Sequence, residues 1–287
     1  MPNPARERIA RDPTDDPHHA IARGVLETLR RLGGGPDPRR LADFTQSLLA
    51  PAPSAFEASV TALLAEGVAR EELVDRYVPA AARALGEGWV DGSLGFAVVT
   101  VGSARLQALV RELADDQDVT ATGAGGAGRT ALVVLPEGQA HSLGAVIAAD
   151  QLRRAGISTR LVMGRSEREL ASILRGGRYD AVLLSVGCGT PLASIASLAT
   201  SIRRAASDPV AIALGGSIAT AHPGAPGADD DTRSGDAAHD LARIEALTGV
   251  DFVGGDVMAA LEACGLAAFR RRAPSPCRLQ GRVRSAP

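Results

Sequence analysis

The spacing of apolar residues changes near the middle of the chain. Between residues 37 and 118, apolar side chains recur every three or four positions, which is typical of amphipathic helices. Short breaks divide this region into four stretches, and the first break contains Pro51 and Pro53. The stretches are Phe44–Leu49, Phe56–Leu64, Leu73–Leu85 and Leu94–Leu113. The pattern predicts a small helical-bundle cap domain over residues 37–118.

After a Gly/Ala/Thr-rich segment at residues 119–128, which we interpret as a linker, short apolar runs alternate with amphipathic stretches. Continuous apolar runs are typical of parallel strands that are buried on both faces. The expected strands are Ala131–Leu135, Ser158–Val162, Ala181–Val186, Val210–Leu214 and Asp251–Val253. Helices are expected at residues 145–155, 167–175, 192–206, 237–247 and 257–264. The alternation predicts an α/β fold over residues 129–268, a Rossmann-like (flavodoxin-like) doubly wound parallel sheet that binds ligands at its carboxyl edge.

The remaining segments have the composition of loose structure. Residues 1–36 hold prolines, mixed charges and a Gly33–Gly35 run, so we expect a flexible arm with one amphipathic piece at Ile21–Leu32. Residues 269–287 are expected to form a disordered arginine-rich tail, and the acidic stretch at 224–236 to be a surface loop.

Composition narrows the class of function. The net charge is −2 and aromatic residues make up 3% of the chain, so neither a basic surface nor aromatic stacking platforms for nucleic acid are expected. The three cysteines show no CxxC spacing, which favours a reducing compartment over a disulfide framework or a zinc site. No signal peptide or membrane-spanning run is recognisable, so we expect a cytoplasmic protein that acts neither on membranes nor directly on nucleic acid.

Candidate binding residues follow the expected strands. Because the carboxyl ends of parallel strands share one edge, loops after different strands meet there. A histidine in such a loop can reach a bound ligand, and paired glycines allow a close backbone approach. The candidates are Gln139, Ala140, His141, Ser142, Leu143 and Gly144 after the first strand, Ser185 and Gly187 after the third, Gly215 and Gly216 after the fourth, and Gly254 and Gly255 after the last.

These residues resemble the motif of the cobalamin-binding domain found in methionine synthase, corrinoid methyl carriers and adenosylcobalamin mutases. That motif is Asp-x-His-x-x-Gly, followed by Ser-x-Leu and then Gly-Gly. The present chain has Gln139-x-His141-x-x-Gly144, then Ser185-x-Gly187, then Gly215-Gly216. The resemblance implies that cobalamin binds with His141 as the lower ligand of cobalt. It also implies that Ser185 contacts the nucleotide tail and that the paired glycines give the tail room.

The chain departs from this motif where the aspartate would be. The resemblance assigns that aspartate a hydrogen bond to the lower histidine, and the amide oxygen of Gln139 can orient an imidazole in the same way. An amide cannot accept a proton, although Glu137 lies close enough in sequence to substitute. We therefore expect a sensor or holder of the cofactor, not an enzyme.

The helical part resembles the cap that covers the upper face of cobalamin in light-sensing regulators of the CarH type. The residues that carry this resemblance are Trp89, Phe96, Val99 and Thr100, and Thr100 stands where those regulators have an upper histidine. We expect all four to contact the cofactor. His18 or His19 in the arm is a candidate upper ligand.

Residues 40–268 are most similar to the AerR/PpaA antirepressors. This resemblance implies a light-responsive regulator of photosystem genes whose partner is a repressor of the PpsR/CrtJ type. Related SCHIC domains bind haem on the same scaffold, which leaves a haem redox sensor as an alternative. The sequence also leaves open a corrinoid methyl carrier of a methyltransferase system and a pure interaction module.

Simpler interpretations exist for several of these residues. His141 would also suit the cap of the helix that follows it, and Trp89 would suit the core of the bundle. Cys188 is expected to be a small buried hydrophobic residue.

Overall fold

The computed structural model describes residues 36–121, 128–219 and 237–266, and the chain divides into two compact units at Leu109/Val110. Several expectations lie outside the described residues, namely those for nearly all of the arm, most of the linker, the 224–236 stretch and the tail. His18 and His19 are among the residues concerned. Within the described part, no helix is both long enough and apolar enough to cross a membrane.

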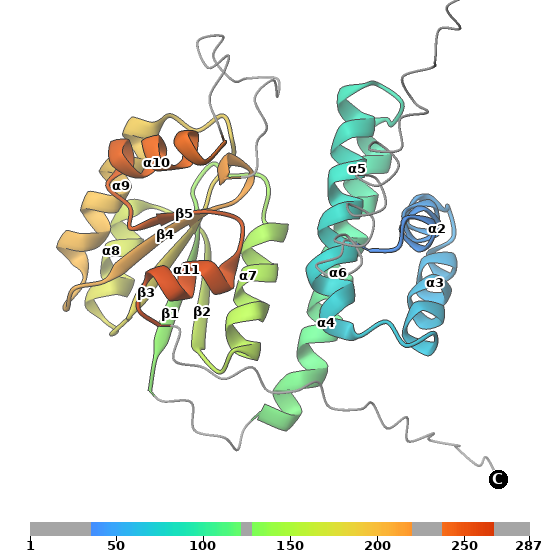
Figure 1. Cartoon of the computed structure of the whole chain (residues 1–287), viewed down its shortest axis with the longest axis horizontal. Helices are drawn as coiled ribbons and strands as arrows, with labels where there is room; N and C mark the ends of the chain where they lie inside the picture. The colour runs from blue at the N-terminus through green and yellow to red at the C-terminus, as the bar shows by residue number, and fades with distance from the viewer. Residues whose placement is uncertain (1–35, 122–127, 220–236, 267–287) are drawn as a thin grey trace, which may run out of the picture. The chain divides into compact units, whose positions relative to one another are not determined.

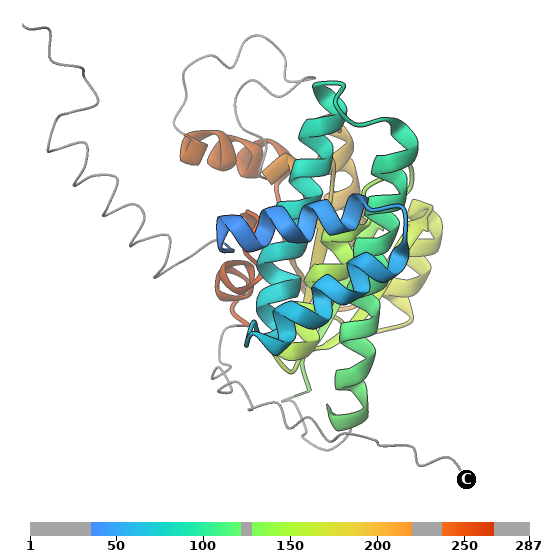
Figure 2. The same ribbon diagram turned by 90° about the vertical axis from the view of Figure 1, so that its right-hand side faces the viewer.

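The helical part contains the four predicted stretches. They are α2 (Pro38–Leu49), α3 (Pro53–Ala65), a continuous helix made of α4 (Arg70–Glu72), the π-turn η2 (Leu73–Tyr77) and α5 (Val78–Val90), and α6 (Phe96–Ala121). Figure 2 shows α2 and α3, both blue, side by side. Helix α6 continues to Ala121, so the boundary expected at residue 118 is wrong by three residues.

Three aromatic rings form the centre of this packing. Phe44 of α2 lies with its ring centroid 5.3 Å from Phe56 of α3 and 5.9 Å from Tyr77 of η2. Arg105 of α6 fastens the end of α2, because its Nη1 donates hydrogen bonds of 2.7 Å to the carbonyls of both Leu48 and Ala50. These carbonyls have no helical partner, so the guanidinium acts as a C-cap supplied by a distant helix.

The second part is a parallel sheet of five strands. The strands are β1 (Thr130–Pro136), β2 (Ser158–Arg165), β3 (Ala181–Ser185), β4 (Ala211–Gly215) and β5 (Phe252–Val253), in the order β2-β1-β3-β4-β5. The connecting helices are α7 (Leu143–Arg154), α8 (Glu167–Arg175), α9 (Leu192–Ala205), α10 (Ala237–Thr248) and α11 (Val257–Ala263). This order is that of flavodoxin-like sheets, so the predicted fold class is confirmed.

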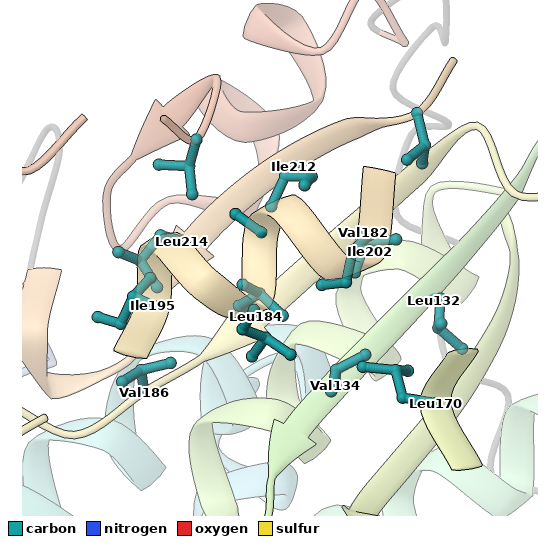
Figure 3. Close-up of a cluster of buried hydrophobic side chains, with 14 of the residues drawn as sticks. Leu132, Val134, Leu170, Val182, Leu184, Val186, Ile195, Ile202, Ile212 and Leu214 are labelled. Carbon is teal, nitrogen blue, oxygen red and sulfur yellow. The ribbon is translucent and has the colours of Figure 1, made fainter. Parts of the chain in front are cut away.

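Figure 1 shows helices on both faces of the sheet. Alternate residues of the strands pack into two separate apolar layers. Leu132 and Val134 of β1 join the layer built with α8 and α9, which Figure 3 shows in close-up. Ala131 and Val133 point to the opposite layer, built with α7 and α11. Burial on both faces explains why the central strands are continuous apolar runs in the sequence.

The direction of the connections reverses between β1 and β3. The helix after β1, α7, packs in one layer, whereas the helix after β3, α9, packs in the other. The two loops therefore leave the sheet on opposite sides although β1 and β3 are neighbours. In open α/β sheets such a reversal opens a crevice at the carboxyl ends of the strands, where ligands bind.

Candidate functional site

The loops after β1 and β3 are joined by the side chain of Gln139. Its Oε1 accepts a hydrogen bond of 2.8 Å from the backbone N–H of Gly187. Its Nε2 donates a hydrogen bond of 3.0 Å to Oγ1 of Thr190. The expectation that the amide oxygen orients His141 is therefore wrong for this structure, because that oxygen is directed to the neighbouring loop.

The loop after β3 is also fastened on its other side. Oγ of Ser217, in the loop after β4, accepts from the N–H of Cys188 at 3.1 Å. The N–H of Ile218 donates to the carbonyl of Val186 at 3.2 Å. Three loops that are far apart in sequence thus meet at one edge of the sheet, as the strand pattern predicts.

His141 lies exposed at this edge, between the turn that holds Gln139 and the start of α7. The N-cap residue of α7 is Ser142, not His141, and no side-chain cap bond is formed there. Ala140 is exposed like His141, whereas Leu143 is half-buried as the first residue of α7. The imidazole is therefore accessible to a ligand that settles on this edge.

Ser185 ends β3 beneath these loops. It is 8% exposed, and a Cβ added to Gly144 would lie 3.7 Å from its hydroxyl oxygen. A larger residue at 144 would extend its side chain over that hydroxyl. Glycine at this position thus places no side chain against the hydroxyl of Ser185.

The glycines after β4 and β5 serve close backbone packing. Gly216 has a φ of +94°, and a Cβ there would lie 2.4 Å from the carbonyl oxygen of Val186. A Cβ on Gly215 would lie 3.3 Å from the carbonyl oxygen of Gly254. Gly254 is half-buried and Gly255 is exposed. Gly216 is thus required by the contact between two loops, independently of any ligand.

The candidate cap residues are exposed on the helical part. Trp89 is 55% exposed and Phe96 is 75% exposed, so the alternative that Trp89 fills the bundle core is wrong. Val99 is half-buried, and the hydroxyl of the exposed Thr100 donates to the carbonyl of Phe96 at 2.8 Å. Between Trp89 and Phe96, hydrogen bonds from the hydroxyl and backbone N–H of Ser93 lower the pKa of Asp91 and hold the turn.

The two described cysteines differ in environment. Cys188 is exposed, so the expectation of a buried residue is wrong. Cys264 is half-buried, and burial raises its thiol pKa to about 11.

Thr190 and Ser217 hold the loop after β3 in place but were not among the candidates. Their only sequence signal is a hydroxyl close to Gly187 in one case and to Gly216 in the other.

The side chains at this edge fit a metal that brings its own ligands. The described residues contain no group of three His, Cys, Asp or Glu side chains that could hold a bare metal ion. What they offer is one exposed imidazole, a hydroxyl at the end of β3 and glycines in the loops after β1, β3 and β4. That set suits a cofactor whose metal is already held by a macrocycle and takes a single ligand from the protein.

Comparisons with known proteins agree with this chemistry. Residues 129–236 match the family described as the B12 binding domain. A 20.5 kDa protein from the bchF-crtJ intergenic region of Rhodobacter capsulatus is 37% identical over 149 residues, which are 52% of this chain and 77% of the relative. The monomethylamine corrinoid protein of Methanosarcina barkeri shares the fold, with a TM-score of 0.57 at 14% identity over 79% of this chain and 97% of its own. The chain therefore belongs to the family of the Rhodobacter protein, the AerR/PpaA-like proteins with a B12-binding domain.

Proposed function

We propose that this protein is a cobalamin-binding regulator without catalytic turnover, in which His141 is the lower ligand of cobalt. The observation that carries the proposal is the exposed imidazole of His141 at the carboxyl edge of the sheet in a B12-binding domain. Imidazole is a common ligand for such metals, and His141 makes no competing helix cap.

The loops after β1 and β3 would hold the nucleotide tail of the cofactor. Gly144 places no side chain against the hydroxyl of Ser185, and a hydroxyl can both donate and accept hydrogen bonds. Cobalamin supplies a cobalt whose upper ligand is exchangeable and, in alkyl forms, sensitive to light. Trp89 and Phe96 are exposed apolar residues, and the resemblance to the cap of light-sensing cobalamin regulators supports the proposal that they would contact the upper side of the ring. His18 or His19 is the proposed upper ligand.

The signal passes to a protein partner, a repressor of the PpsR/CrtJ type. The relative from the bchF-crtJ intergenic region supports this assignment, as does the similarity to the AerR/PpaA antirepressors. A change of upper ligand acts as a switch only if the resulting states differ in affinity for the repressor. Light is the signal that we propose to change that ligand.

A methyl-carrier role is the alternative. It requires a group near His141 that takes up and releases a proton as cobalt changes state. Gln139 cannot do this, because an amide does not titrate and both ends of this one are hydrogen-bonded to the loop after β3. The comparisons give the haem alternative no support.

The first test is the absorption spectrum of the protein reconstituted with hydroxo-, methyl- or adenosylcobalamin. Corrinoid bands should stay with the protein through gel filtration and be lost or shifted in His141→Ala. His239→Ala in α10 is the matched histidine control and should retain the wild-type spectrum. Repressor binding should then be compared between apo, dark and illuminated forms.

Two results would contradict the proposal. Wild-type protein that retains no corrinoid would refute the cofactor assignment. Equal repressor affinity in all three forms would refute the switch.

A further inference from the structure

The two residues that differ from the cobalamin motif are in contact with each other. Gln139 stands where the motif has aspartate, and Gly187 stands where it has leucine. The Oε1 of Gln139 accepts from the N–H of Gly187 at 2.8 Å, and a Cβ at 187 would lie 3.1 Å from that same oxygen. A leucine at 187 would crowd the amide, and an aspartate at 139 has one methylene less with which to reach across. The glutamine and the glycine are therefore suited to each other.

Their contact joins the two loops between which the ligand is expected. Gln139 follows β1 and Gly187 follows β3, the two neighbouring strands between which the helix connections reverse. Thr190 completes the bridge by accepting from Nε2 of Gln139, and its own N–H donates to the carbonyl of Gly187 at 3.2 Å. A narrow chain that enters between these loops toward Ser185 has to displace both side-chain hydrogen bonds.

We propose that Gln139, Gly187 and Thr190 form a clasp that the nucleotide tail of cobalamin must open, so that Gln139 sets the rate at which tail-bearing corrinoids enter and leave. The inference rests on the proposed function, because it assumes that a corrinoid occupies this edge. Gln139 is a positioning residue in this scheme and does not touch the metal.

Cobinamide separates the clasp from general loosening of the loops, since it has the corrin ring but lacks the nucleotide tail. Association of hydroxocobalamin and of cobinamide with the full-length apoprotein is followed by stopped-flow absorbance. The measured quantity is the association rate of hydroxocobalamin divided by that of cobinamide.

Gln139→Ala removes both side-chain hydrogen bonds and should raise the ratio about tenfold, because each neutral hydrogen bond corresponds to a factor of a few. Thr190→Val removes one hydrogen bond and should raise it less. Gln139→Glu should restore the wild-type ratio, because its carboxylate can accept from both the N–H of Gly187 and the hydroxyl of Thr190.

Ser217→Ala is the matched control. It removes the bond that holds the same loop on its β4 side, and Ser217 does not take part in either hydrogen bond of Gln139. Its ratio should equal that of wild type even if both rates change. In the apoprotein, amide hydrogen exchange at Gly187 should become faster in Gln139→Ala than in wild type and stay unchanged in Ser217→Ala.

The outcomes distinguish the clasp from the cofactor assignment. Association rates that change equally for cobalamin and cobinamide in Gln139→Ala, or do not change at all, would overturn the clasp and leave the proposed function intact. Wild-type protein that binds neither corrinoid would overturn the proposed function and the clasp with it.

Discussion

Gly138 and Gly216 are glycines for different structural reasons. Gly216 and Gly138 both have a positive φ, +94° and +80°, which side chains rarely adopt. At Gly216 a Cβ would also meet the backbone of Val186, whereas at Gly138 nothing lies within 4 Å. Both glycines lie just after a strand in the sequence, and only the tertiary contact distinguishes them.

This difference predicts unequal stability losses in urea unfolding. Gly138→Ala should cost about 1 kcal/mol, the strain of a side chain at positive φ. Gly216→Ala should cost about 3 kcal/mol, because the added methyl must also displace the loop after β3. Equal losses in the two variants would mean that the close approach at Gly216 relaxes without cost.

Gln139 shows the same limit at another residue. Its place in the motif could be recognised from the sequence, but the direction of its amide could not. That direction depends on Gly187 and Thr190, which lie 48 and 51 positions along the chain.

Individual elements were predictable wherever local signals agree. Helix α8 has the expected bounds, Glu167–Arg175. A capping box marks its start. Ser166 Oγ accepts from the N–H of Glu169, and Glu169 Oε2 accepts from the N–H of Ser166 at 3.1 Å. These local bonds need no tertiary partner.

The capping box predicts a pH dependence. Hydrogen bonds from the hydroxyl and then the backbone of Ser166, with a smaller effect of Arg165, hold the pKa of Glu169 below its usual 4.5. A pKa that is lower in the folded state contributes stability above the unfolded value, and this is lost as pH falls through the folded value. The difference in free energy of unfolding between wild type and Glu169→Gln should thus be largest above pH 4.5 and decrease as the pH falls below it. Thermal unfolding as a function of pH measures this difference, and one that is constant with pH would contradict the assignment.

Strand β2 differs from its sequence expectation at the scale of the element. It extends to Arg165, three residues beyond the predicted end, and Val162 is its only buried residue. An edge strand needs one partner and can keep pairing with β1 after its apolar run ends.

At the scale of the whole molecule, the sheet carries its own core. Among the residues that the structure describes, both apolar layers consist of side chains between Ala131 and Leu266, with no member from the helices before the sheet. A domain with a complete core can fold alone.

A fragment of residues 128–266 should therefore unfold in one cooperative transition and give dispersed amide resonances. Circular dichroism on heating and a two-dimensional NMR spectrum would test this, with the full-length chain as the reference. A fragment without a cooperative transition would show that the sheet depends on the helical part.

The sequence by itself determined the classes of element, the parallel sheet and the positions of the three glycine-containing loops. Apolar periodicity, caps and turn residues are local, so they can be recognised without a structure. Only the tertiary structure decided that Trp89 and Cys188 are exposed, that Arg105 caps a distant helix, and that Gln139 reaches the loop after β3 instead of His141. The physical reason is that exposure and side-chain direction depend on neighbours brought together by folding, and no local pattern records which neighbours those are.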